Sequence, residues 1–272
     1  MDHQDVKAAA SSAADHPALE AAARAGYATS GLLHLLIGWI TLQVAFGGSG
    51  KNADQSGALA SLAGNPAGKA ALWIGVIGFA GLALWQLTDA LVGHPGDDKD
   101  AWGGRAKAAG KGVVYLALAW SALNFARGKS SNSRSQSVDF TAKLLDKPGG
   151  RILVVVIGLA VIAVGAYHVY KGWTKKFLEG IDVSEASPSA RTAITRLGQV
   201  GYPAKGVALM IVGGLLTWAA ITYNPKKAAG LDAALRSVLD VPFGQVLLTL
   251  VALGLIAFGV FCFFRARYPE RT

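Results

Sequence analysis

The chain has 272 residues, of which 52% are hydrophobic and only 16% are charged, whereas about 25% are charged in an ordinary soluble domain. The charges are also segregated, because six stretches contain no Asp, Glu, Lys or Arg. These stretches are Ala25–Gly50, Ala70–Thr88, Gly112–Ala126, Ile152–Tyr170, Gly206–Pro225 and Val241–Phe264. A bilayer core about 30 Å thick needs about 20 apolar residues as helix. This pattern argues against an ordinary soluble domain and predicts an all-α polytopic membrane protein with six transmembrane helices.

The chain begins with a polar segment, residues 1–19, which we expect to be cytoplasmic. Asp2, Asp5 and Asp15 interrupt this segment and it has no apolar core, so we expect the first span to act as the insertion signal. The single cysteine, Cys262, lies in the last span, so an intrachain disulfide is excluded.

The basic residues predict the orientation of the chain in the membrane. Six spans place both termini on one side, and that side holds 15 of the 26 Lys and Arg residues. The positive-inside rule therefore predicts a multi-pass protein of the bacterial inner (cytoplasmic) membrane with both termini cytoplasmic. The net charge of +9 favours contact of the bilayer-embedded chain with anionic lipid headgroups. The basic residues are scattered without interleaved aromatics, so we expect no nucleic-acid partner.

A two-helix unit occurs three times. The turns at Pro66 and Pro148 are 82 residues apart, and the next turn, at Pro242, follows after 94 more. The same offsets relate Leu62 to Leu144 and then to Val238. This register predicts three tandem hairpin repeats in a pseudo-threefold arrangement. The expected domains are repeat 1 at 20–98, repeat 2 at 99–178 and repeat 3 at 187–268.

Each repeat has the same predicted parts: a lead-in, a span, an outer loop with a short amphipathic helix, a proline turn and a returning span. Ser187 and Pro188 form a good N-cap and N1 pair for the third lead-in, and we expect the lead-ins to lie on the membrane surface as helices. Residues 1–14, 94–98 and 128–137 are predicted to be flexible.

Small residues recur at equivalent places in the spans and predict packing faces, since small side chains let helices approach closely in lipid. In the first helix of each repeat they are Gly31 and Gly38, Gly112 and Ala119, and Gly206 and Gly213. In the returning helices they are Gly75 and Gly78, Gly158 and Gly165, and Gly254 and Gly259.

Polar residues in or beside the spans gather toward the end that we expect to be cytoplasmic, and they form a candidate polar vestibule. Its members are His34, Gln86, Asp89, Lys111, His168, Lys171, Lys205 and Arg265. Asp89, Lys171 and Arg265 occupy equivalent repeat positions, so Asp89 is expected to pair with a basic residue of another repeat. Interfacial anchoring is the alternative role for the whole set.

Catalytic and cofactor sites are not expected. His34 and His168 could in principle ligate haem iron from two spans, but the pair is not repeated. The segment Gly47–Lys51 resembles a phosphate loop only superficially, because Ala45 and Asn52 replace the required Gly and Ser or Thr. We therefore expect no catalytic residues, no metal and no cofactor.

Two functions remain open from the sequence. The first is a non-catalytic scaffold, a subunit for a membrane protein partner, or a lipid-organising element. The alternative is a channel or carrier that moves a small solute through a cavity between the repeats.

The chain also resembles a known family. The resemblance rests on two motifs: Gly26-Tyr27 followed by Gly31, and Gly201-Tyr202-Pro203-Ala204-Lys205-Gly206 at the start of the third unit. With the glycine-rich returning helices, they resemble the bacterial membrane proteins known only as domain of unknown function 1206, over about residues 20–268. The second unit departs from the pattern, having Lys107 where the others have glycine. The resemblance implies a polytopic membrane protein and no catalytic residues.

Overall fold

The computed structural model describes residues 17–48, 50–92 and 101–269. Most of the polar segment predicted at 1–19 lies outside the described residues, as do the segments at 1–14 and 94–98 that were predicted to be flexible.

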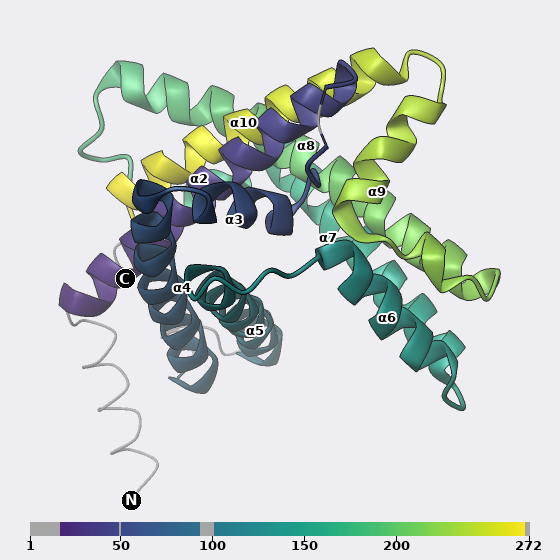
Figure 1. The fold of residues 1–272 in the computed structure, drawn as a ribbon. Helices are drawn as coiled ribbons and strands as arrows, with labels where there is room; N and C mark the ends of the chain where they lie inside the picture. The colour runs from purple at the N-terminus through teal and green to yellow at the C-terminus, as the bar shows by residue number, and fades with distance from the viewer. Residues whose placement is uncertain (1–16, 49, 93–100, 270–272) are drawn as a thin grey trace, which may run out of the picture. The chain divides into compact units, whose positions relative to one another are not determined.

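The described helices follow one order three times: a long helix, a short helix and a second long helix (Figure 1). The first set is α2 (Pro17–Ala45), α3 (Gln55–Ala63) and α4 (Pro66–Val92). The second is α5 (Ala101–Ala126), α6 (Ser133–Leu145) and α7 (Gly150–Trp173), and the third is α8 (Pro188–Ile221), α9 (Gly230–Ser237) and α10 (Gly244–Arg267). Short 3-10 helices are η1 (Lys176–Gly180), η2 (Pro225–Lys227) and η3 (Val238–Asp240). The predicted all-α class is confirmed, with a short helix inside each hairpin.

Five of the long helices, α2, α4, α7, α8 and α10, are long and apolar enough to cross a membrane. Their outward faces are strongly apolar: Ile152 at the start of α7 is 70% exposed and Val156 is 55% exposed. Exposed apolar surface on this scale is typical of a lipid-facing helix. Helix α5 does not reach the same hydropathy, because Arg105, Lys107 and Lys111 lie in its first half.

The predicted register of the turns is confirmed by one contact that occurs three times. The second residue after each turn proline is a buried glycine at or near the start of a returning helix. A Cβ atom on Gly68 would collide with the carbonyl oxygen of Leu62, and one on Gly150 would collide with that of Leu144. In the third repeat, Gly244 lies in the same way against Val238. Glycine is therefore needed at this position to let the returning helix start directly under the short helix.

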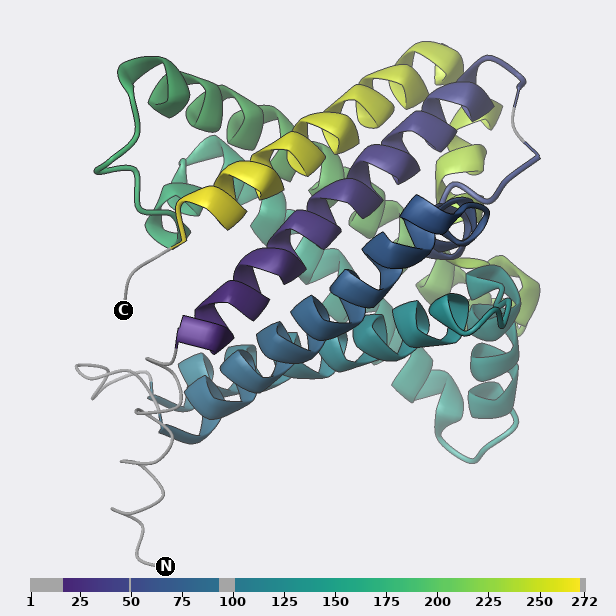
Figure 2. The ribbon, with the colours of Figure 1, turned by 60° about the vertical axis from the view of Figure 1, so that its left-hand side comes forward.

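The chain divides into two compact units, one formed by residues 17–30 and 62–130 and the other by 31–61 and 131–269 among those described. In the first unit, α4 lies beside α5 in both views (Figures 1 and 2). The start of α2 packs on α4, where Gly26 meets the backbone of Gly78 and the side chain of Leu82. The close approach depends on the absence of side chains from both glycines.

In the second unit, α7 packs along α8, and α10 packs against both α8 and the latter part of α2, beside which it lies in Figure 2. All the small residues that the sequence marked as packing positions are buried. A Cβ atom on Gly206 would lie 2.5 Å from the carbonyl oxygen of Gly165, and one on Gly31 would lie 2.8 Å from that of Gly259. These distances show that the helix backbones are almost in contact at the predicted faces.

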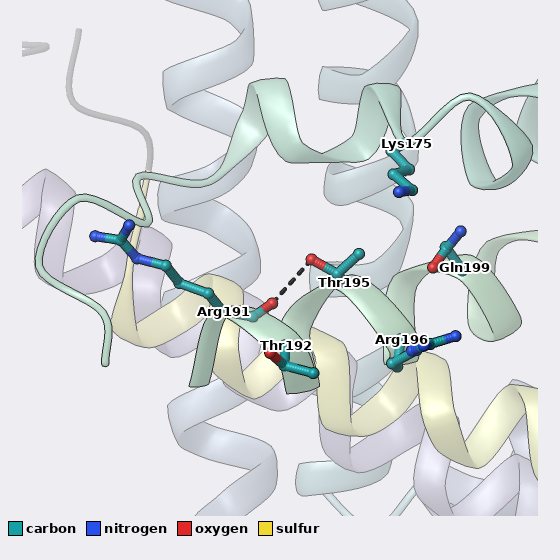
Figure 3. A pocket seen from close by; sticks show the side chains of 6 residues that line it. All are labelled: Lys175, Arg191, Thr192, Thr195, Arg196 and Gln199. Atoms are coloured by element: carbon teal, nitrogen blue, oxygen red, sulfur yellow. Dashed lines mark hydrogen bonds between the residues drawn. The ribbon is translucent and has the colours of Figure 1, made fainter. Parts of the chain in front are cut away.

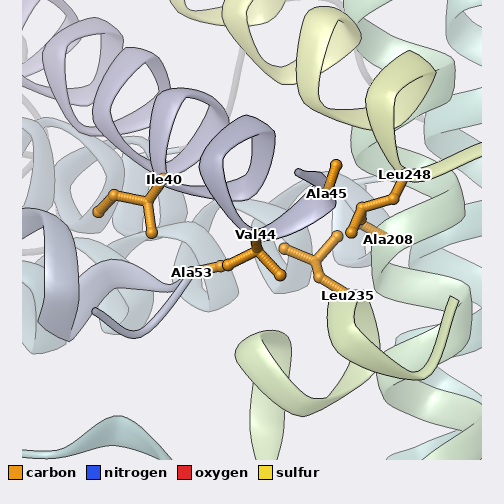
Figure 4. Close-up of a cluster of buried hydrophobic side chains, with 7 residues drawn as sticks. All are labelled: Ile40, Val44, Ala45, Ala53, Ala208, Leu235 and Leu248. Carbon is orange, nitrogen blue, oxygen red and sulfur yellow. The ribbon is translucent and has the colours of Figure 1, made fainter. Parts of the chain in front are cut away.

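The short helices bury their apolar stripe as the i, i+3 spacing predicts. In the second unit, Leu235 of α9 is fully buried in a cluster with Val44 at the end of α2 and Ala53 before α3 (Figure 4). Asp232 of α9 is also buried and accepts the backbone N–H of Ala53 at 2.8 Å and the Nε–H of Arg236 at 2.9 Å. This buried carboxylate joins the segment before α3 to α9, and it was not predicted from the sequence.

Two expectations, one about a loop and one about the third lead-in, are corrected. The serine-rich segment predicted to be flexible at 128–137 contains the start of α6, because the Asn132 side chain accepts the N–H groups of Arg134 and Ser135 and caps the helix. The third lead-in does begin with the predicted Ser187 cap, but it is not a separate surface helix. It continues into the span as one helix, α8, with Pro203 inside it.

Candidate functional site

The eight residues of the candidate polar vestibule fall in different units. Gln86 and Asp89 of α4 and Lys111 of α5 belong to the first unit. The other five belong to the second unit and come from four helices: His34 of α2, His168 and Lys171 of α7, Lys205 of α8 and Arg265 of α10.

In the second unit, the predicted polar residues surround an aromatic cluster that is centred on Tyr202. The Tyr202 ring is stacked on Phe177 at 5.3 Å between ring centroids and meets the edges of Phe258 at 5.1 Å and Phe261 at 5.4 Å. All four side chains are buried. Edge-to-face and offset-stacked pairs of this kind add about 0.5–1.5 kcal/mol each to the area that they bury. The cluster is thus a closely packed core rather than a water-filled cavity.

The basic and imidazole groups lie against the rings of this cluster. The Lys205 ammonium is 4.4 Å from the centroid of Phe258, and the Lys171 ammonium is 5.5 Å from that of Tyr202. His34 is 4.7 Å from Phe258, ring centroid to ring centroid, and His168 is stacked on Tyr202 at 5.8 Å. A cation over an aromatic face is stabilised by the ring quadrupole, by about 0.5–2 kcal/mol. These polar groups therefore pack against the aromatic cluster in this unit.

The two histidines considered for haem are held by different neighbours. His168 Nδ1 lies 2.8 Å from the carbonyl oxygen of Val164, one turn earlier in α7. His34 lies against Phe258. Within residues 17–48, 50–92 and 101–269, no group of three or more His, Cys, Asp or Glu side chains is placed to hold a metal ion.

In the first unit, Gln86 is buried, at 6% exposure, on the same helix as the fully buried Phe79. Its amide oxygen accepts no hydrogen bond from the residues that the structure describes. Asp89, one turn further on, is half-buried, and Lys111 at the edge of the charge-free part of α5 is exposed. The predicted pairing of Asp89 with a basic residue of another repeat stays a prediction.

A surface pocket of about 370 Å³ lies where the end of α7 meets the start of α8 (Figure 3). Its lining residues are Lys175, Arg191, Thr192, Thr195, Arg196 and Gln199. The sequence reading missed it, although the five residues from α8 follow the i, i+1, i+4, i+5, i+8 spacing of one helix face. Lys175 could not be assigned from spacing, because it precedes η1 and reaches the pocket only through the fold.

The side chains that line the pocket differ in whether they form hydrogen bonds or ion pairs with other described residues. The Arg191 guanidinium turns away from the other five residues in Figure 3 and donates to the carbonyl oxygens of Ser184 at 2.7 Å and Ala186 at 3.0 Å. The Thr195 hydroxyl donates to the Arg191 carbonyl oxygen at 2.8 Å. Lys175 and Arg196 are exposed, and neither forms an ion pair or hydrogen bond with another described residue.

Comparison with known proteins gives the same threefold division as the sequence register. A family profile described as Domain of Unknown Function (DUF1206) matches three times, at residues 25–93, 106–175 and 200–269. The chain is also 28% identical over 252 residues to a protein of Bacillus subtilis (strain 168), "Uncharacterized protein YxxB", covering 92% of this chain and 90% of the relative. No solved structure matches. The family matches extend over most of the chain, which therefore belongs to the DUF1206 family.

Proposed function

We propose that this chain is a non-catalytic integral membrane protein of the bacterial cytoplasmic membrane. Its six spanning helices form three hairpins about an approximate threefold axis, and it acts as a scaffold, a partner subunit or a lipid-organising element. The observation that carries the proposal is the near-contact of small residues between successive repeats.

The same repeat positions meet at three helix pairs. On α5, a Cβ atom at Gly112 would lie 3.5 Å from the carbonyl oxygen of Ala83 on α4. The equivalent positions of the next pair are Gly206 on α8 and Gly165 on α7, with the 2.5 Å approach given above. The third pair is Gly31 on α2 and Gly259 on α10. Each returning helix thus meets the first helix of the following repeat, and the last meets the first, which supports a closed threefold order.

Helix α5 is the sixth span of the proposal. It has 26 residues, close to the 27 residues of its neighbour α4. Its charge-free part covers only 112–126, so Lys111 must extend its ammonium toward the headgroups. Spans that are too short are accommodated by such snorkelling and by local thinning of the bilayer.

Sidedness can be measured directly on intact cells. Cysteines introduced at Ser131 and Asn224 should react with an impermeant thiol reagent, because both sites lie on the proposed outer side. A cysteine at Asp98, on the proposed cytoplasmic side, should react only after permeabilisation. The opposite labelling pattern would overturn the orientation.

A scaffold role is favoured over transport by the packing of the second unit. His34, His168, Lys171 and Lys205 were candidates for lining a solute path, but each contacts an aromatic ring of the buried Tyr202 cluster. Opening a path there would separate aromatic rings whose centroids lie about 5 Å apart. A packed centre of this kind fits a rigid scaffold.

A carrier is the second candidate, and Gln86 is the observation in its favour. Leaving a buried amide oxygen without a hydrogen bond costs about 1–3 kcal/mol. Such a cost is tolerated where a polar ligand or water supplies the partner during function.

Purification in mild detergent tests the proposal, with an unrelated multi-pass protein of the same membrane purified in parallel as control. The scaffold predicts a membrane protein or a lipid retained at fixed stoichiometry through two different detergents and absent from the control. Solute flux in proteoliposomes that is abolished by Gln86→Leu, with the fold intact, would instead establish the carrier and overturn the scaffold.

A further inference from the structure

The pocket between the end of α7 and the start of α8 is lined by positively charged side chains and hydrogen-bond donors. The proposed scaffold role does not account for this lining. Its lining includes Lys175, Arg196 and the amide of Gln199, and no acidic side chain lies among the described residues that line it. We propose that this pocket binds the phosphate group of an anionic phospholipid.

The fold builds the pocket by turning the chain sharply after α7. Thr174 caps α7, and Lys175 then takes a left-handed backbone conformation with φ of 59°, which reverses the chain direction. Phe177 follows and is buried against Gly198, whose missing side chain makes room for the ring. Docking of Phe177 on α8 therefore fixes Lys175 over the helix face that carries Arg196.

The two cations lack compensating charge within the described structure. Neither Lys175 nor Arg196 pairs with an acid or a carbonyl oxygen among the described residues, whereas Arg191 is already used in holding the loop before α8. Two uncompensated cations beside one cavity attract an anion of matching size. Lys, Arg and Gln together offer an ammonium, a planar fork of N–H donors and an amide N–H, which suits the oxygens of a phosphate group.

The helix register places this pocket at headgroup depth. Helices α7 and α8 are antiparallel, since Gly165 meets Gly206 and, further along α7, Gly172 meets Pro203. The charge-free part of α7 ends at Tyr170 and the helix ends at Trp173, which at 1.5 Å per residue is about 4.5 Å further along the axis. Lys175 follows directly after the cap residue Thr174. A headgroup layer is about 5–8 Å thick on each side of the hydrocarbon.

Exposed aromatic residues mark the same depth. Trp173 is 84% exposed and Tyr170 is 48% exposed, just before Lys175 in the chain. Trp and Tyr are enriched at membrane–water interfaces. A lipid whose acyl chains lie along the apolar face of α7 would have its phosphate at the level of Lys175. The inference rests on the proposed membrane insertion and on no choice between scaffold and carrier.

The test is native mass spectrometry of the detergent-purified protein titrated with phosphatidylglycerol or with phosphatidylcholine. We expect retention of phosphatidylglycerol in preference to phosphatidylcholine. The double variant Lys175→Gln/Arg196→Gln should weaken phosphatidylglycerol binding by about tenfold or more, since each cation near a membrane surface contributes about fivefold. The matched control Lys226→Gln/Lys227→Gln removes two exposed cations from η2 and should leave the affinity unchanged.

A charge-conserving variant separates binding from folding. Lys175→Arg/Arg196→Lys should keep the preference for phosphatidylglycerol. Unchanged phosphatidylglycerol binding in the Lys175→Gln/Arg196→Gln variant, or equal binding of the two lipids by the wild-type protein, would overturn the proposal. Displacement of phosphatidylglycerol by millimolar inorganic phosphate would assign the pocket to a soluble phosphate compound and overturn the lipid assignment. None of these results bears on partner retention, which tests the scaffold separately.

Discussion

Gly213 and Gly214 are adjacent on α8 and offer a direct test of glycine-mediated packing. A Cβ atom on Gly213 would lie 2.6 Å from the carbonyl oxygen of Gly158 and 2.8 Å from Cγ1 of Ile162, both on α7. A Cβ atom on Gly214 would meet nothing within 4 Å. The same substitution to alanine should therefore have opposite effects at neighbouring positions.

The magnitude follows from the geometry. Ordinary van der Waals contact of a Cβ atom begins at about 3.4 Å, so α7 and α8 must separate locally by almost 1 Å at Gly213. Overpacking of this kind costs about 1–3 kcal/mol. Replacing glycine by alanine inside a helix gains up to about 1 kcal/mol at either site. That gain cancels in the comparison, which leaves Gly213→Ala less stable than Gly214→Ala by about 2 kcal/mol.

The assay is thermal unfolding of both variants in the same mild detergent. A difference of about 2 kcal/mol corresponds to roughly 4–8 °C between the two melting temperatures. Gly213→Leu and Gly214→Leu should widen that gap, because the larger side chain at position 213 cannot be accommodated by a small shift. Equal melting temperatures for the two alanine variants would refute the packing of α7 on α8.

Three further substitutions test other parts of the fold by the same assay. Asp232→Ala should lower stability by about 2–4 kcal/mol, because it strands a buried backbone N–H and an arginine, whereas the exposed Asp240→Ala should change it by less than about 0.5 kcal/mol. Similar losses for both would contradict the buried network. Asp89→Lys should destabilise more than Asp89→Asn if Asp89 pairs with a cation; unaltered stability for both would rule that pairing out. Phe243→Gly, which copies Gly149 at the equivalent left-handed position, should stabilise by about 1 kcal/mol, and a loss would show that the exposed Phe243 ring contributes more than its backbone strain costs.

The repeat architecture was predictable because its constraints are local and occur three times. The proline turns, the glycine under each short helix and the small-residue faces are all written as residue identities at fixed offsets. Gly150 against Leu144 and Gly206 against Gly165 follow directly from that register. The Ser187 cap is equally local, since its side chain reaches only the next turn.

Side-chain contacts across the chain were less predictable. The sequence predicts that His168 and Lys205 lie toward the same end of the spans, but their contact with Tyr202 and Phe258 depends on helix rotation, which composition does not fix. Asp232 was missed because its partner, the Ala53 N–H, lies 179 residues away and is a backbone group that any sequence supplies.

The pocket between α7 and α8 was missed for a related reason. Its α8 face has a helical spacing that could have been recognised, but Lys175 joins it only because Phe177 docks on Gly198. The flexible loop assigned at 128–137 was wrong in its second half, since serine-rich composition outweighed the capping signal of Asn132.

The central claim is that three equivalent hairpins surround an approximate threefold axis. An experimental structure in lipid, with residues 26–92, 108–170 and 201–265 superposed on one another, measures this directly. The hairpins should overlay with Pro66, Pro148 and Pro242 equivalent, and successive rotations should each be about 120°, as threefold symmetry requires. Helix α5 should span the bilayer like the other five long helices. Hairpins that fail to overlay, or an α5 that lies outside the hydrocarbon region, would contradict it.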